Sequence, residues 1–337
     1  MRRYFIFILM IILMTSLNSW AQGIAKVGTA GYQFLKIVSG ARGLALGDAG
    51  DPIVFDASSM FWNPATLNFT KNSSLFLAHG NYLADMNYEA FGFSKVLKGV
   101  GVVGVNMVYL DSGPIEETTV EMQNGTGNTF SAVSYAVGVS FARLLTERFG
   151  IGGSVKYVNE NLTKDLGEDN STGAWAVDLG TIYYPGFERF ESLRLTMSVR
   201  NFGPEVRLKG QYYDFDGIKG EFLTEPTDYK EFPLPLMFRF GLGYDPIDNA
   251  THKLSIAIIG EHPNDNLERV NLGAEYTFLK IISLRGGYVL NHDVRTFSAG
   301  LGLNLSVFGQ TNLKIDYGYA HYGVLEDLQM FSLIFDW

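Results

Sequence analysis

The residues best suited to chemistry in this chain are its histidines. They are His79, His252, His262, His292 and His321. Three of them, His262, His292 and His321, fall near the ends of alternating segments, where Glu261 and Asp293 are adjacent in sequence. A hydrolase would pair a histidine with a carboxylate or a serine in such a place. No His-Glu-x-x-His spacing occurs and the chain has no cysteine, so the sequence predicts no catalytic group, metal or cofactor.

A second set of polar residues puts charge on one face of several alternating segments. The set consists of Asp178, Arg194, Arg200, Arg239, Glu275, Arg285 and Asp316. Arginine has five donors and no acceptor, so a buried arginine needs a carboxylate partner. Two interpretations stay open. These residues anchor another part of the chain through paired hydrogen bonds, or they line a wet interior.

The elements that carry these side chains are alternating segments of strand length. In 270–278, for example, Val270, Leu272, Ala274, Tyr276 and Phe278 share one face. About fourteen such segments follow residue 72: 74–83, 87–97, 100–111, 131–145, 148–161, 172–184, 192–202, 234–244, 253–262, 268–279, 281–290, 295–306, 311–321 and 327–336.

A soluble sandwich also alternates, but the segment length and the connections favour a membrane barrel. About ten residues suffice for a tilted strand to cross a bilayer. Long connections near 112–130, 162–171 and 203–233 alternate with tight ones near 98–99, 146–147 and 280. Tyr and Phe recur near strand ends, as in aromatic girdles. We therefore predict an all-β fold: a transmembrane antiparallel β-barrel of about 14 strands, closed so that no strand edge is left.

The first residues predict export. Arg2 and Arg3 precede a short apolar run, and Ser19-Trp20-Ala21 fits a cleavage site, so residues 1–21 are expected to be a signal peptide. Without Arg2 and Arg3, 24 basic residues face 35 acidic ones, a net charge of 24 − 35 = −11. This balance argues against nucleic acid as a partner. The predicted location is the bacterial outer membrane, with its lipid as a partner.

Residues 34–67 do not alternate. They are rich in Gly, Ala and Asp and too apolar for a disordered tail. Asp56 is expected to cap a short helix that Pro64 stops. We predict that residues 22–71 form a luminal hatch and that residues 72–337 form the barrel around it.

The motifs of this opening stretch resemble those of the PorV/PorQ family. They are 34–37 (FLKI), 40–42 (GAR), 46–50 (LGDAG), 56–59 (DASS) and 62–65 (WNPA), and weaker matches follow at 271–276, 284–288 and 315–319. The family is similar to the FadL group of outer-membrane barrels, whose hatch also carries Asn-Pro-Ala. The resemblance implies a barrel of about fourteen strands with a hatch, here marked by Arg42, Asp48, Asn63, Pro64 and Ala65.

Three functions compete. PorV-like members imply a non-enzymatic role beside a type IX secretion translocon, receiving exported cargo, and the aromatic-rich loop 203–233 suits a contact surface. FadL-like members imply diffusion of hydrophobic small molecules, which needs an apolar pocket between hatch and wall. An outer-membrane hydrolase is the least favoured. Asp165, Glu168 and Asp169 are interpreted as a solvated loop.

Overall fold

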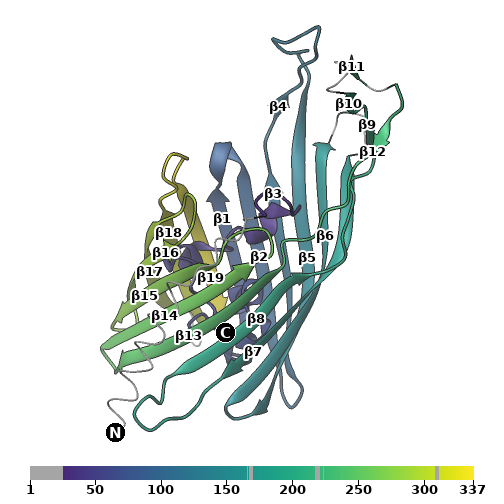
Figure 1. Cartoon of the computed structure of the whole chain (residues 1–337). Coiled ribbons are helices and arrows are strands. Elements are labelled where there is room, and N and C mark those ends of the chain that lie inside the picture. Colours follow the sequence, from purple (N-terminus) through teal and green to yellow (C-terminus); the bar gives the residue numbers. More distant parts are fainter. Residues whose placement is uncertain (1–25, 165, 167–169, 217–220, 223, 308–310) are drawn as a thin grey trace.

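Fourteen long strands close into one antiparallel barrel, which confirms the predicted fold class (Figure 1). The computed structural model describes residues 26–164, 166, 170–216, 221–222, 224–307 and 311–337. The wall strands are β1 (Ser73–Asn81), β2 (Asn87–Leu97), β3 (Gly101–Asp111), β5 (Thr129–Thr146), β6 (Phe149–Lys164), β7 (Ser171–Tyr183), β8 (Arg194–Phe202), β13 (Met237–Asp248), β14 (His252–Pro263), β15 (Arg269–Phe278), β16 (Ile282–Leu290), β17 (Phe297–Val307), β18 (Thr311–Ala320) and β19 (Leu328–Asp336).

Closure depends on the first and last strands. β19 pairs with both β18 and β1, and β3 pairs with both β2 and β5, so every wall strand has two neighbours. The backbone N–H and C=O groups of the wall strands therefore find their hydrogen-bond partners in neighbouring strands, as a lipid environment requires. Trp337 continues this closure, because its backbone exchanges hydrogen bonds with Ser73 at 2.9 and 3.0 Å.

One strand boundary differs clearly from the prediction. β13 begins at Met237 and not at residue 234, because Pro233 and Pro235 lack the N–H that a ladder needs. It then runs on to Asp248 through a register shift between Tyr244 and Ile247, a bulge that accommodates Pro246.

The two ends of the barrel differ in their connections. Five short strands lie in the long connections after β3 and β8: β4 (Ile115–Glu116), β9 (Gln211–Tyr212), β10 (Phe215–Asp216), β11 (Glu221–Phe222) and β12 (Thr227–Asp228). These connections project well beyond the wall at the top of Figure 1. We call this the long-loop end. The opposite, short-turn end has tight turns at 98–100, 147–148 and 279–281, and membrane barrels carry such turns on their periplasmic side.

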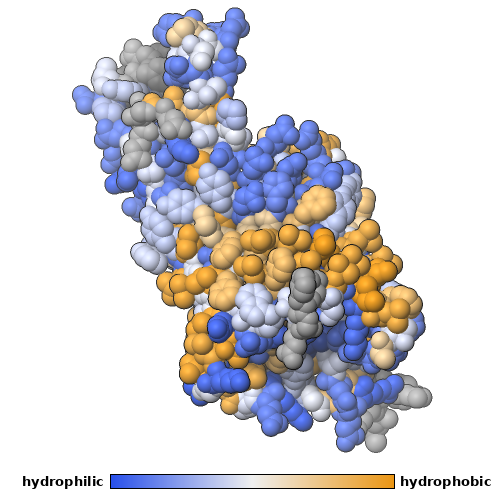
Figure 2. Space-filling view, turned by 180° about the vertical axis from the view of Figure 1, so that it is seen from behind, coloured by the Kyte–Doolittle hydropathy of each residue, from blue (hydrophilic) through white to orange (hydrophobic). Residues whose placement is uncertain are grey.

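Outward-facing side chains form an apolar belt around the wall. In β7, Trp175 and Leu179 are exposed whereas Ala174 and Ala176 are buried, because successive side chains point to opposite faces. The belt lies between hydrophilic ends in Figure 2. Its exposed members include Leu77, Phe91, Val105, Val139, Phe240, Ile258, Leu284, Leu301 and Phe331. A belt of this kind is the surface that a bilayer covers.

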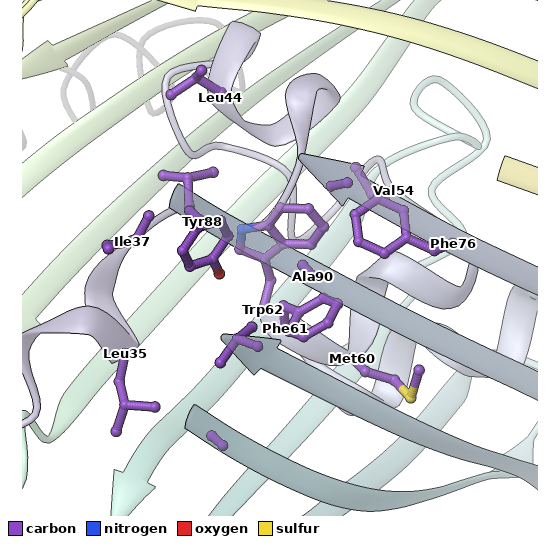
Figure 3. Packing of buried hydrophobic residues seen from close by; sticks show 14 of the residues in the cluster. Leu35, Ile37, Leu44, Val54, Met60, Phe61, Trp62, Phe76, Tyr88 and Ala90 are labelled. Atoms are coloured by element: carbon purple, nitrogen blue, oxygen red, sulfur yellow. The ribbon is translucent and has the colours of Figure 1, made fainter. Parts of the chain in front are cut away.

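The residues before β1 lie among the strands and make short helices. These are η1 (Gln33–Lys36), α2 (Ala41–Ala45), η2 (Ala57–Phe61) and η3 (Pro64–Phe69), and a further turn, η4 (Leu83–Asp85), joins β1 to β2. We call residues 26–72 the N-terminal segment. Its apolar side chains pack against inward-facing wall residues, for instance Phe61 against Phe76 with ring centroids 5.8 Å apart (Figure 3). No described helix has the length and apolarity to span a membrane.

The helix boundaries in this segment correct one expectation. Asp56 caps η2, as predicted, by accepting a hydrogen bond from Ser58 N at 3.0 Å. Pro64 does not stop that helix, which already ends at Phe61. Pro64 instead opens η3 at its first position, where the missing N–H costs nothing.

Candidate functional site

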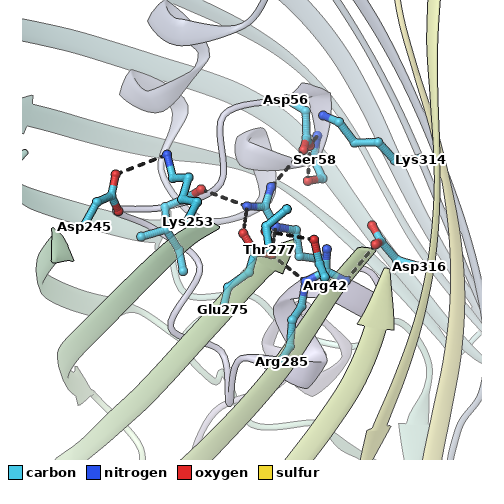
Figure 4. Close-up of polar contacts among 12 residues, drawn as sticks. Arg42, Asp56, Ser58, Asp245, Lys253, Glu275, Thr277, Arg285, Lys314 and Asp316 are labelled. Carbon is cyan, nitrogen blue, oxygen red and sulfur yellow. Dashed lines mark hydrogen bonds and ion pairs between the residues drawn. The ribbon is translucent and has the colours of Figure 1, made fainter. Parts of the chain in front are cut away.

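Four of the predicted polar residues form one continuous chain of ion pairs. Arg42, in α2, donates from Nε and Nη2 to the two carboxylate oxygens of Glu275 in β15, at 2.9 and 2.7 Å. Arg285 in β16 donates to Glu275 at 2.6 Å and to Asp316 in β18 at 2.7 Å. The N-terminal segment is thereby connected to three wall strands, β15, β16 and β18 (Figure 4).

The charge on Arg42 is strongly favoured at this place. Its guanidinium also donates to Ile53 O at 3.2 Å and lies 3.5 Å from Asp56. Burial works against the charge, but Glu275, and then Asp56, more than offset this and raise the pKa of Arg42. Breaking this pair would leave an uncompensated buried charge, which costs about 3–5 kcal/mol.

A second cluster surrounds Arg239, which is fully buried in β13. Arg239 donates to Asp48 Oδ2 at 2.9 Å and to the Asp48 backbone oxygen, and it lies 3.2 Å from Asp51 and 3.3 Å from Glu261. The Trp62 indole donates to Asp48 Oδ1 at 2.9 Å. Arg239 therefore joins a turn of the N-terminal segment to β13 and β14, the two strands that come before β15 in the wall.

The two aspartates of that turn respond differently to burial. Burial works against the charge of Asp48, but Arg239, and then Arg295 and Arg200, lower the pKa of its carboxyl group. Burial raises the pKa of Asp51, and Arg239 offsets this only in part. One guanidinium thus faces one firmly ionised and one less readily ionised carboxyl group.

The Asn63-Pro64-Ala65 turn lies directly on the wall. Asn63 Oδ1 accepts from Ala65 N at 3.0 Å and its Nδ2 donates to Thr181 O, in β7, at 3.0 Å. The wall has glycine where this turn touches it. A Cβ on Gly180 would overlap the Asn63 side chain, and one on Gly152 would overlap the Pro64–Ala65 backbone. Glycine therefore permits the close approach.

Asp178, Arg194 and Arg200, the other predicted residues, also face inward, but they take part in neither the Arg42 chain nor the Arg239 cluster. Asp178 accepts from Lys156 Nζ at 2.8 Å, and Lys156 also donates to Asn201 at 2.6 Å. The Arg194 guanidinium donates two hydrogen bonds to the Asp245 carboxylate, at 2.8 and 2.6 Å. This ion pair therefore joins two wall strands and does not involve the N-terminal segment. Arg194 approaches the N-terminal segment at Phe55, whose ring centroid lies 5.6 Å from the guanidinium carbon.

Arg200 reaches the N-terminal segment through one weak hydrogen bond, from Nη2 to Leu35 O at 3.3 Å. The prediction omitted Lys156 and Asp245, although the alternation that placed Asp178 also puts each of them on an inward face. It omitted Asn201 as well, which follows inward-facing Arg200 and is buried because the strand departs from alternation there, with a φ of 60°. It also omitted Asp51, Trp62 and Glu261.

The first ion-pair chain faces a cavity of about 480 Å³ at the short-turn end. Charged side chains dominate its lining, with Lys71, Lys253, Lys280 and Lys314 toward the mouth. Lys314 pairs with Asp336 at 2.7 Å and Lys253 with Asp245 at 3.2 Å. This cavity is therefore suited to water and polar solutes and not to a hydrocarbon.

The histidines do not assemble a described catalytic site. His79, His262 and His321 lie at the long-loop end and pair with Glu89, Glu268 and Asp327 at 2.6, 3.1 and 2.8 Å. The partner of His262 is not the adjacent Glu261, which points inward to Arg239. Among the described residues, no serine or threonine hydroxyl is hydrogen-bonded to a histidine, and no cluster of histidine and carboxylate side chains fits a metal ion.

Some expectations fall on parts of the chain that the structure leaves out. Residues 1–21, the expected signal peptide, and Asp165, Glu168 and Asp169 lie outside the described residues. In the loop after β8, Tyr212 stacks on Tyr229 with centroids 5.2 Å apart. Phe232 in the same loop packs on Tyr32 of the N-terminal segment at 6.1 Å.

The closed wall, the apolar belt and the polar interior define an outer-membrane β-barrel, and solved structures of that class share the fold. The toluene transporter TbuX of Ralstonia pickettii is 14% identical, with a TM-score of 0.56 over 88% of this chain and 97% of its own. The toluene transporter TodX of Pseudomonas putida is 12% identical, with a TM-score of 0.56 over 92% and 98%. A FadL homologue of Pseudomonas aeruginosa is 10% identical, with a TM-score of 0.54 over 88% and 97%.

Sequence comparison identifies the family. The family model described as "Type IX secretion system protein PorV" matches residues 21–259, so the chain belongs to the PorV family. It is an outer-membrane protein, as predicted. A search of curated proteins gave no match.

Proposed function

We propose that this barrel is a non-enzymatic accessory of type IX-like protein secretion, and that it contacts the translocon or exported cargo. The observation that carries the proposal is the PorV family match over residues 21–259. The apolar belt contacts outer-membrane lipid, and the long loops supply a surface outside the membrane for a protein partner.

Those loops expose apolar side chains that lie away from the belt. In the connection after β3, Val120 is 84% exposed and Met122 is 50% exposed, and after β8 Tyr213 is 58% exposed. Exposed apolar and aromatic groups of this kind are typical of contact surfaces. The N-terminal segment then acts as a hatch of residues 22–71, seated through Arg42, Asp48, Asn63, Pro64 and Ala65, and residues 72–337 are the barrel that carries the loops.

The test combines secretion with partner recovery. A deletion strain is complemented with the wild-type chain, with Val120→Ser/Met122→Ser, or with Val324→Ser as the matched control, since Val324 is 97% exposed on another loop of the same end. The deletion should impair secretion, and the double variant should recover less translocon or cargo in mild detergent than the control. Unchanged secretion in the deletion strain, with neither partner recovered, would contradict the proposal.

A second candidate is a channel for hydrophobic small molecules. The structural likeness to the TbuX and TodX toluene transporters supports it. The charged cavity at the short-turn end weighs against it, because a hydrocarbon would have to displace water from ion pairs there. Toluene uptake by cells that express the chain, compared with the deletion strain, separates the two functions: a gain in uptake supports the channel.

A further inference from the structure

A second luminal cavity, of about 340 Å³, lies at the long-loop end of the barrel. Its lining comes from the connections there, with Tyr82, His292, Arg295 and Tyr322, from Arg269 at the start of β15, and from Lys36 of the N-terminal segment. The carboxylates of Asp48, Glu261 and Asp293 also line it. The volume is in the range of ligand pockets, about 300–1,000 Å³. It is separate from the ion-pair chain that begins at Arg42.

Two arginines at this cavity each have a buried Nε–H without a hydrogen-bond partner among the described residues. Arg295 is 5% exposed. Its guanidinium donates from Nη2 to Gly47 O at 3.2 Å, and its Nε is buried without a partner in the described part of the chain. Arg269 Nε is also buried without a partner, and its ion pair with Glu261 spans 3.7 Å, too long for a hydrogen bond. A buried guanidinium with five donors normally satisfies more of them.

His292 adds another donor. Its Nδ1 accepts from the backbone N–H groups of Val294 and Arg295 at 3.2 and 3.1 Å. The neutral ring therefore carries its proton on Nε2. Burial, and then Arg269 and Arg295, lower the pKa of His292 to about 3, whereas Asp293 acts in the opposite direction. The field at the imidazole is thus positive.

The carboxylates nearby are largely occupied. Asp48 and Glu261 face Arg239, at 2.9 and 3.3 Å, and Asp265 accepts from Lys36 and Gln33, both at 2.8 Å. Asp293 is held by Asn266 at 3.2 Å. Asn271 Oδ1, a neutral acceptor of the lining, and Asp265 Oδ1 are also buried without a partner among the residues that the structure describes, but the unused charged groups of the lining include the cationic Arg269 and Arg295.

We propose that this cavity binds a small, water-soluble oxyanion of the carboxylate or phosphate class. Its oxygens accept from the guanidinium groups of Arg269 and Arg295 and from His292 Nε2. The site depends on charge-assisted hydrogen bonds and needs no apolar tunnel. It is independent of the proposed secretion role.

The test uses the full chain in nanodiscs of zwitterionic lipid, titrated calorimetrically with inorganic phosphate and, separately, with acetate. Arg269→Gln and Arg295→Gln should each weaken binding about tenfold, the loss expected for one charge-assisted hydrogen bond. Arg207→Gln is the matched control, because Arg207 lies at the same end in an exposed pair with Asp228. It should bind as the wild type does.

A second measurement avoids the risk that a variant misfolds. The wild-type chain is treated with an arginine-selective dicarbonyl reagent, and the modified residues are mapped by mass spectrometry. Phosphate or acetate should protect Arg269 and Arg295 but not Arg207. Protection by one probe alone assigns the class, and protection by both assigns a general oxyanion site. No saturable binding and no protection by either probe, or equal effects at Arg207, would overturn the proposal.

Discussion

Arg42 and Glu275 meet as a two-point fork, with Nε–Oε2 at 2.9 Å and Nη2–Oε1 at 2.7 Å, although 233 positions separate them in the chain. The fork joins a five-residue helix to the wall at a place that lipid cannot reach. Because Glu275 also binds Arg285, the helix is tied to the wall through a network and not through one pair.

Removing one partner of this fork should loosen the N-terminal segment. For Glu275→Gln, we expect a loss of about 3–5 kcal/mol in the local opening free energy, because two buried guanidinium groups lose their shared carboxylate. Hydrogen exchange of residues 41–56 measures this loss. Arg207→Ala, which breaks an exposed pair, is the control. Unchanged exchange in the Glu275 variant would show that the fork does not hold the segment.

The Asn63 turn should be sensitive to the size of one wall residue. Gly180→Val places a side chain where Asn63 lies, so the turn must move and the barrel should unfold at a lower temperature. Gly286→Ala is the control, since no heavy atom lies within 4 Å of its added Cβ. Gel heat-modifiability gives the unfolding temperature of each variant. Equal temperatures would contradict the close approach.

Lys156 and Asp178 should couple energetically. Lys156→Met alone leaves Asp178 buried with one hydrogen bond, from Asn201 N at 2.7 Å, and should cost about 3–5 kcal/mol of unfolding free energy. Adding Asp178→Asn removes the unpaired charge and should recover part of that loss. A double-mutant cycle in urea measures the coupling. Additive effects of the two substitutions would mean that the pair is not formed.

Acidification should destabilise the protein through His292. The pKa of His292 is lowered to about 3 in the folded chain, below its ordinary value of about 6.5. Between these values the unfolded chain binds a proton that the folded chain does not, so stability falls as the pH falls through this window. Unfolding of wild type and His292→Gln from pH 7 to pH 4 measures the difference. The variant should show the weaker pH dependence, and identical profiles would refute the assignment.

The wall was predictable because its signal is local. A period of two places Glu275, Arg285 and Asp316 on the inward faces of their own strands, and this holds whichever strands lie next to them. Which arginine meets which carboxylate depends on the stagger of the closed wall and on a segment without periodicity, so the fork from Arg42 to Glu275 could not be assigned. Sequence adjacency also misled: His262 and Glu261 are neighbours, but they point to opposite faces, and His262 pairs with Glu268 in the next connection.

The absence of cysteine from the chain allows a direct test of how the N-terminal segment sits in the barrel. A Cβ built on Gly273, in β15, would lie 3.3 Å from Leu46 Cβ, close to the separation of about 3.5–4.5 Å in a disulfide. Leu46→Cys/Gly273→Cys should therefore form an intramolecular disulfide in outer membranes, detected by mass spectrometry, whereas Leu46→Cys/Gly286→Cys should not, because Gly286 lies on the outer face. Free thiols in both pairs would contradict a segment held inside the closed wall.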